Sequence, residues 1–238
     1  TATATDVQAL GRITGPTDTL LMVDGITSVG ALPLETDAWG LDIVASGSQK
    51  AMMLPPGLAN VAVSEKAWKA AAAVKPQAFY LDLKAYRKSI ADSDTPYTPA
   101  VSLIRGMKVA LDMIHKIGIE KVWARTALLA KATRTAAEAI GLKVYSSQPS
   151  DSVTGIWYPQ GIDDAFRKAL EKTYGCSVAG GQDDIKGKVF RVSHMGYVDP
   201  LDTIGLIAAT EYTLAKLGVK VKIGAGVAAA TAVLKDWE

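Results

Sequence analysis

The sequence is poor in the residues that build metal centres and disulfides. Among its 238 residues there is one cysteine, Cys176, and there are two histidines, His115 and His194. A single cysteine excludes an internal disulfide and a cysteine-rich metal or iron–sulfur site, and it favours a reducing compartment such as the cytoplasm. The two histidines are isolated and lack the spacing of metal ligands. We therefore predict no metal site.

Long apolar runs and basic runs are also lacking. The longest segment of small apolar residues, 223–234, is shorter than the roughly 20 residues that cross a bilayer, so we expect a terminal helix there and no membrane partner. The 26 lysines and arginines are scattered among 24 acids, which speaks against a nucleic-acid groove. An apolar content of 49% is typical of a globular chain with a real core.

Apolar runs alternate with amphipathic segments along the first half. Runs at 20–24, 41–44 and 58–64 predict strands, Asp6 is placed to cap a helix over 6–13, and Ser64 precedes another helix. This alternation predicts an α/β fold with a largely parallel sheet over residues 1–115. Residues 116–238 predict an α+β domain, with helices at 119–140, 163–174 and 203–217 and strands at 141–145, 153–158, 176–181 and 188–194.

A lysine and a carboxylate follow two of the predicted strands. Lys50 lies in a turn of small residues after the strand 41–44, and Asp24 ends the strand 20–24. Ligands of α/β sheets bind at such strand ends, where a lysine can form a Schiff base with pyridoxal phosphate and an acid can pair with the pyridinium nitrogen. From these residues alone, however, a loop lysine is more often a solvated charge.

Three short motifs permit a comparison with known protein families. They are Val-Asp-Gly-Ile-Thr-Ser at 23–28, Ser-Gly-Ser-Gln-Lys at 46–50 and Pro-Pro-Gly-Leu at 55–58. With these motifs the sequence up to about Lys216 resembles the class V pyridoxal-phosphate-dependent aminotransferases. The similarity is greatest to the alanine–glyoxylate and serine–glyoxylate branch, which includes a cyanobacterial member labelled a soluble hydrogenase subunit. The resemblance implies the type I fold of these transferases, with a mostly parallel large domain and an α+β small domain. It also implies transfer of an amino group from serine or alanine to glyoxylate or a similar 2-oxo acid.

The resemblance also assigns roles at the cofactor. It implies that Lys50 and Asp24 are the catalytic pair, with Lys50 as the Schiff-base residue. It places Ile26 against one face of the cofactor ring. We interpret Gln49 and Ser48 as neutral hydrogen-bond donors for the cofactor phosphate.

The remaining implied contacts lie farther along the chain. Tyr97 and Thr98, in a proline-flanked loop, are the candidates for reaching the phosphate of a neighbouring subunit, which implies a homodimer with shared active sites. A rigid surface turn explains the same prolines. Arg191 is the candidate for holding the substrate α-carboxylate with two parallel hydrogen bonds. The alternative is an arginine that extends to solvent from a half-buried strand.

The chain opens on Thr1 without an initiator methionine. We expect it to be the C-terminal two-thirds of such an enzyme, because the resemblance places a glycine-rich phosphate loop and a ring-stacking aromatic residue upstream. A second hypothesis is therefore a catalytically silent binding or structural subunit that keeps the fold. The sequence leaves both open.

Overall fold

The computed structural model describes residues 2–237, which form two compact units. The first, here called the Lys50 unit, comprises residues 6–26 and 34–116. The second, the Arg191 unit, comprises residues 2–5, 27–33 and 117–237.

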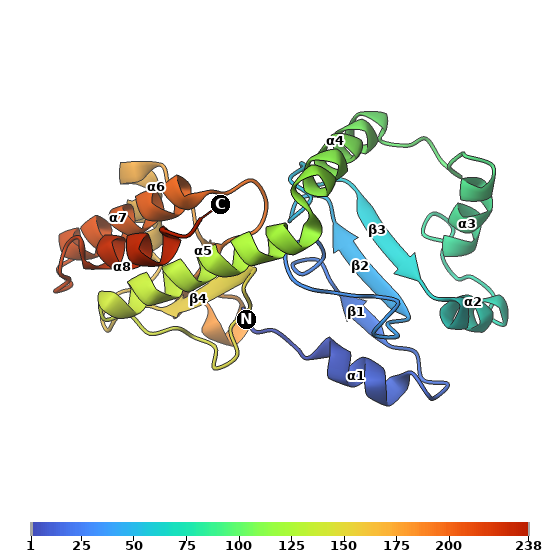
Figure 1. Ribbon diagram of the computed structural model, residues 1–238, viewed down its shortest axis with the longest axis horizontal. Helices are drawn as coiled ribbons and strands as arrows, with labels where there is room; N and C mark the ends of the chain where they lie inside the picture. The colour runs from blue at the N-terminus through green and yellow to red at the C-terminus, as the bar shows by residue number, and fades with distance from the viewer. Residues whose placement is uncertain (1, 238) are drawn as a thin grey trace. The chain divides into compact units, whose positions relative to one another are not determined.

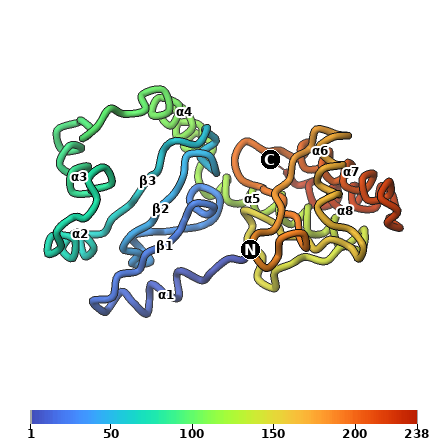
Figure 2. The backbone as a smooth tube through the Cα atoms, turned by 180° about the vertical axis from the view of Figure 1, so that it is seen from behind, coloured from blue at the N-terminus to red at the C-terminus, as the bar shows by residue number. Residues whose placement is uncertain are grey.

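The Lys50 unit is a three-stranded sheet with helices around it (Figure 1). The strands β1 (Met22–Asp24), β2 (Ile43–Gly47) and β3 (Ala59–Val63) lie side by side in that order, as Figure 2 shows from behind. Its helices are α1 (Val7–Thr14), α2 (Glu65–Ala72), α3 (Leu83–Ala91) and α4 (Val101–Ile117). In chain order the unit runs α1, β1, β2, β3, α2, α3 and α4, so its strands follow one another without a helix between them. The mixture of a sheet with flanking helices agrees with the predicted α/β class.

The sheet is less parallel than predicted. β1 and β2 pair in parallel, whereas β2 and β3 pair antiparallel, with Ser46 opposite Asn60. The reason is the connection between them: the turn after β2 is short and contains no crossover helix, so the chain can only return antiparallel. The prediction of a parallel sheet therefore holds for one of the two pairings in the described part of the chain.

Capping residues explain where the helices begin. The Asp6 carboxylate accepts the N–H of Ala9 at 2.8 Å, and the Ser64 hydroxyl accepts the N–H of Ala67 at 3.0 Å, so both predicted helix starts are confirmed. The helix α3 was not predicted. None of its residues is buried, so this helix shows no apolar stripe facing a core.

The Arg191 unit packs helices against a small antiparallel sheet. Its strands β4 (Val153–Trp157), β6 (Val189–Ser193) and β5 (Ala179–Gly180) lie in that spatial order, and a short 3-10 helix η1 (Asp183–Ile185) joins β5 to β6. Its helices are α5 (Ile119–Ala139), α6 (Ala165–Tyr174), α7 (Pro200–Lys216) and α8 (Ala225–Leu234). The strand predicted at 141–145 is wrong as an element, because only Val144 bridges to Ile156 there.

The core of the Arg191 unit explains this arrangement. Phe190 of β6 and Phe166 of α6 are both almost fully buried, with ring centroids 4.8 Å apart. On the other side, α8 packs against α5 (Figure 1). Its N-terminus is held by Glu211 of α7, whose buried carboxylate accepts the N–H groups of Gly224 and Gly226, each at 2.6 Å. Among residues 2–237 no helix is long and apolar enough to span a bilayer.

Candidate active site

The ends of β1 and β2 lie at the same edge of the sheet. The parallel register sets Asp24 opposite Ala45, and the N–H of Gly25 donates to the carbonyl of Ala45 at 2.9 Å. Since both strands run in one direction, Asp24 and the turn that follows β2 leave the sheet on one side. This is the carboxyl edge at which α/β sheets bind ligands.

The turn that carries Lys50 is fixed by the side chain of Ser48. Ser48 is fully buried, and its hydroxyl donates to the carbonyl of Pro55 at 2.8 Å and accepts the N–H of Leu58 at 3.2 Å. Within the turn, the N–H of Met53 donates to the carbonyl of Lys50 at 3.0 Å. Our interpretation of Ser48 as a phosphate donor is therefore wrong, because its one proton is already used inside the turn.

The other candidates at this edge keep their polar groups available. Asp24 is exposed, and its carboxylate accepts the N–H of Ile26 at 3.0 Å. Lys50 is half-buried, and among the described residues its amine has no hydrogen-bond or ion-pair partner. Gln49 is exposed, and its side chain folds over Gly47, which has no Cβ to obstruct it. Asp24, Lys50 and Gln49 therefore lie at one edge of the sheet, and in the described chain no ion pair joins Asp24 to Lys50.

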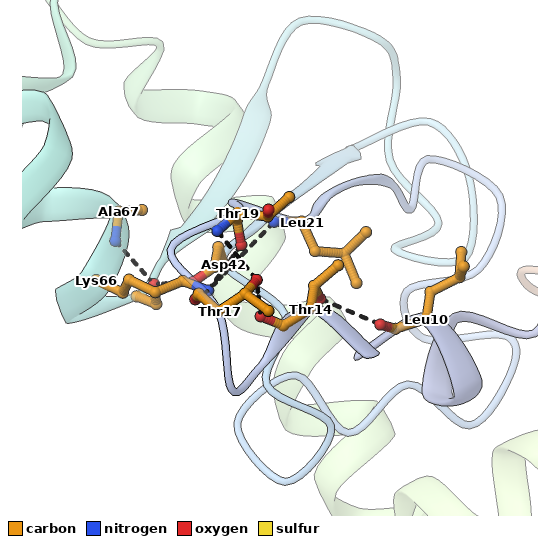
Figure 3. A network of polar contacts seen from close by, with 9 residues as sticks. Leu10, Thr14, Thr17, Thr19, Leu21, Asp42, Lys66 and Ala67 are labelled. Atoms are coloured by element: carbon orange, nitrogen blue, oxygen red, sulfur yellow. Dashed lines mark hydrogen bonds and ion pairs between the residues drawn. The ribbon is translucent and has the colours of Figure 1, made fainter. Parts of the chain in front are cut away.

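A buried carboxylate anchors the opposite end of β2 (Figure 3). Asp42 is 3% exposed and accepts the N–H of Leu21 at 2.9 Å and the hydroxyl of Ser64 at 2.8 Å, and it forms an ion pair with Lys66 at 3.0 Å. Burial alone would raise the pKa of Asp42, but these hydrogen bonds and the Lys66 charge outweigh it and lower the pKa below its ordinary value.

Lys66 extends this network to the start of β1. Its amine also donates to the carbonyls of Thr17 at 3.3 Å and Thr19 at 2.8 Å (Figure 3). One lysine of α2 therefore joins the loop before β1 to the first residue before β2. Because the two strands are tied at this end, the register that sets Asp24 opposite Ala45 is well determined.

The predicted loop residues Tyr97 and Thr98 belong to the same unit. The hydroxyl of Tyr97 donates to the carbonyl of Phe79 at 2.9 Å, and its ring lies 4.7 Å from that of Tyr80. Thr98 is exposed. In this arrangement the Tyr97 proton is used within the chain, whereas the Thr98 hydroxyl has no hydrogen-bond partner among the described residues.

Arg191 belongs to the Arg191 unit, at the centre of its sheet. It stands opposite Gly155 of β4 and Ala179 of β5, it is half-buried, and its Nε donates to the carbonyl of Gly180 at 2.8 Å. Among residues 2–237 its two terminal nitrogens have no hydrogen-bond partner. The guanidinium is thus fixed along one edge and free along another.

The strand end next to Arg191 carries a buried histidine. His194 is 2% exposed, and its Nε2 lies 2.9 Å from the hydroxyl of Thr154 on β4. Burial, assisted by the nearby charge of Arg134, lowers the pKa of His194 to about 3. The ring is therefore neutral at neutral pH and holds β6 against β4. Within the described chain no group of three acidic, cysteine or histidine side chains could hold a metal ion.

Comparison with known proteins shows the family of the chain. The family model described as aminotransferase class-V matches residues 1–197. The chain belongs to the class-V aminotransferase family. It is 42% identical to a soluble hydrogenase small subunit of Synechococcus over 98% of this chain and 62% of that protein. It is 40% identical to a serine–glyoxylate aminotransferase of Methylorubrum extorquens over 91% of this chain and 56% of that protein.

A solved structure gives the same result for the fold. The pyridoxamine–pyruvate aminotransferase of Mesorhizobium loti superposes with a TM-score of 0.93 at 34% identity, over 98% of this chain and 62% of that one. This class-V chain therefore has the type I fold of pyridoxal-phosphate-dependent transferases, as predicted. It spans about three-fifths of the length of each of these relatives.

Family membership implies pyridoxal 5′-phosphate as the cofactor, and the residues present fit it. The cofactor offers an aldehyde, which requires an amine, and a ring nitrogen, which requires an acid. Lys50 and Asp24 carry groups of these two kinds next to adjacent strand ends, and no ion pair joins them in the described chain. Two kinds of contact were not predicted: those of the buried Ser48 hydroxyl, which fix the turn of Lys50, and that of the Gly180 carbonyl, which holds Arg191. Neither leaves a signal in the sequence, because each is created only by folding.

Proposed function

We propose that this class-V chain is the part of an aminotransferase that moves an amino group from serine or alanine to glyoxylate or a similar 2-oxo acid. The observation that carries the proposal is the parallel pairing of β1 and β2, which presents Asp24 and the Lys50 turn at one edge. The serine–glyoxylate aminotransferases among its relatives support the choice of substrates. An aspartate–glyoxylate relative supports glyoxylate as acceptor more than it supports either donor.

In this proposal each residue has a defined role. When bound, pyridoxal phosphate supplies an electron sink for the negative charge that develops on the substrate Cα. The Lys50 amine would hold the cofactor through its aldehyde, and as a free amine it would take the proton from the substrate Cα. The Asp24 carboxylate keeps the ring nitrogen protonated. Ile26 covers one face of the ring, and Gln49 donates to the phosphate.

The remaining candidates also have proposed roles. Arg191 holds the substrate α-carboxylate with its free terminal nitrogens, which fixes the direction of the Cα–H bond. Tyr97 and Thr98 reach the phosphate bound by a second copy of the chain, so the active enzyme is a homodimer with shared sites. Tyr97 must then give up its bond to the Phe79 carbonyl, whereas Thr98 needs no such change.

Borohydride reduction tests the role of Lys50. The cofactor-loaded protein is reduced and digested, and mass spectrometry locates the pyridoxyl group, which we expect on Lys50. Lys50→Arg keeps the charge and should lose the label. A label on a different lysine in the wild-type protein contradicts the assignment.

Asp24 has a separate test with a conservative variant. Asp24→Asn keeps the shape of the side chain and should still permit labelling of Lys50, but it removes the acid that keeps the ring nitrogen protonated. We expect kcat to fall by about 100-fold or more, the range typical of one positioned proton-transfer group. Wild-type kcat in Asp24→Asn contradicts the proposed pairing.

A further inference from the structure

The Arg191 guanidinium is held by backbone rather than by an acidic side chain. Its Nε donates to the carbonyl of Gly180 at 2.8 Å, across the antiparallel pairing in which Gly180 stands opposite Phe190. No ion pair to Arg191 occurs in the described chain. The positive charge is therefore oriented without being neutralised, which is what a carboxylate-binding arginine requires.

The bond to Gly180 leaves one edge of the guanidinium for a ligand. A guanidinium can bind a carboxylate side-on, through Nε and one Nη, or end-on, through its two Nη atoms. The Nε–H of Arg191 is already donated to Gly180, so the side-on edge is occupied. Only the end-on edge offers two parallel free N–H groups.

Two contacts fix the strand that carries the Gly180 carbonyl. The backbone N–H of Gly181 donates to the carbonyl of Val189 at 3.0 Å. The carbonyl of Ile185, in η1, lies so close to Gly181 that a Cβ there would overlap it. β5 is therefore seated between β6 and η1, and only glycine permits this approach.

A second arginine holds the other side of β5. The Nε of Arg167 on α6 donates to the carbonyl of Val178 at 2.9 Å, and a Cβ on Gly180 would overlap its Nη1. Asp164 accepts from Arg167 at 3.3 Å and from the hydroxyl of Tyr158 at 3.0 Å. Burial and the bond to Asp164 raise the pKa of Tyr158, so its proton stays in place at neutral pH.

We propose that the Gly180–Gly181 pair is a positioning element that orients Arg191 for end-on binding of the substrate α-carboxylate. This inference rests on the proposed function for the identity of the carboxylate, and it adds the group that aims the arginine and the edge that is used. Gly180 and Gly181 touch no substrate; they act through Arg191.

The test uses the cofactor-loaded enzyme and three glycine-to-alanine variants. Gly181→Ala forces the Ile185 carbonyl away and shifts β5, whereas Gly180→Ala meets only the flexible end of Arg167 and is the milder form. Gly205→Ala is the matched control, because Gly205 lies on α7 in the same unit and nothing is within 4 Å of its added Cβ.

The first readout is independent of activity. With 15N-labelled arginine, the Nε–H signal of Arg191, identified by its loss in Arg191→Lys, should exchange slowly in the wild type and in Gly205→Ala. It should exchange fast in Gly181→Ala. Titration with propionate should leave the Nε–H protected, as end-on binding requires. Rapid exchange in the wild type, or loss of protection on adding propionate, overturns the proposal.

The second readout separates positioning from a general structural defect. A displacement of about 1 Å at a positioned group can cost about 100-fold, so we expect kcat/KM for alanine to fall by about 10- to 100-fold in Gly181→Ala. Slow conversion of ethylamine, which lacks the carboxylate, should be unchanged. An equal fall for alanine and ethylamine overturns the proposal. If Gly181→Ala does not fold, Gly180→Ala should show the same selective loss to a smaller degree.

Failure of the proposed function gives a different result. If the complete wild-type enzyme transaminates neither compound, the assigned activity is wrong. The exchange of the Arg191 Nε–H in Gly181→Ala and Gly205→Ala then still decides whether the glycine pair positions the arginine.

Discussion

Removing the Ser48 hydroxyl should loosen the turn that carries Lys50. Ser48→Ala deletes two hydrogen bonds, one to the Pro55 carbonyl and one from the Leu58 N–H, at a site with 0% exposure. At about 0.5–1.5 kcal/mol for each bond, the free energy of unfolding should fall by about 1–3 kcal/mol. Alanine fits the space of serine, so a cavity adds little to this cost.

Ser46→Ala is the matched control for this variant. Ser46 is also buried and lies two residues earlier, but within residues 2–237 its hydroxyl has only a long contact of 3.5 Å from the Asn60 amide. Urea unfolding of both variants measures the difference, and a Kd for pyridoxal phosphate reports on the turn itself. We expect Ser48→Ala to be the less stable and to bind the cofactor more weakly. Equal unfolding free energies for the two variants refute the argument that the Ser48 hydroxyl fixes the turn.

Two further predictions concern buried carboxylates. The pKa of Asp42 is lowered in the folded protein, so its charge stabilises the fold at neutral pH. In urea unfolding, the wild type should therefore have a higher free energy of unfolding than Asp42→Asn. This difference should be complete above about pH 5 and should shrink as the pH falls below about 4. A difference that grows on acidification contradicts this sign. Glu211→Gln keeps the size of the side chain but replaces the carboxylate that accepts the N–H groups of Gly224 and Gly226 with a neutral amide. We expect the free energy of unfolding to fall by about 1.5–3 kcal/mol and amide exchange in α8 to become faster. Unchanged exchange in α8 would show that Glu211 does not cap this helix.

Local signals in the sequence predicted most of the elements. Apolar spacing and a capping side chain each act within a few residues, so the helices α1 and α5 were predicted to within about two residues of their observed ends, and the start of α2 was predicted from Ser64. The strand β6 was predicted for the same reason. α3 was not predicted, and none of its residues is buried.

Only part of the candidate site could be predicted from the sequence. Lys50 and Asp24 stand next to strand ends in recognisable motifs, so the pair could be proposed from the sequence, and its catalytic role stays a prediction. The role of Ser48 could not be derived in this way. A hydroxyl in a turn either faces a ligand or closes the turn, and the choice depends on where Pro55 and Leu58 return.

The sequence by itself determined the α/β class, the family and the residues that bear the proposed chemistry, because these follow from local periodicity and from motifs. The tertiary structure alone decided the antiparallel return of β3, the capping of α8 by Glu211 and the acceptor of the Arg191 Nε–H. The hydrogen-bond partner lies 11 residues away in the chain for Arg191 and 13 residues away for Glu211. A polar group satisfies its hydrogen bonds with whatever folding brings beside it, so its partner is fixed by packing rather than by its neighbours in sequence.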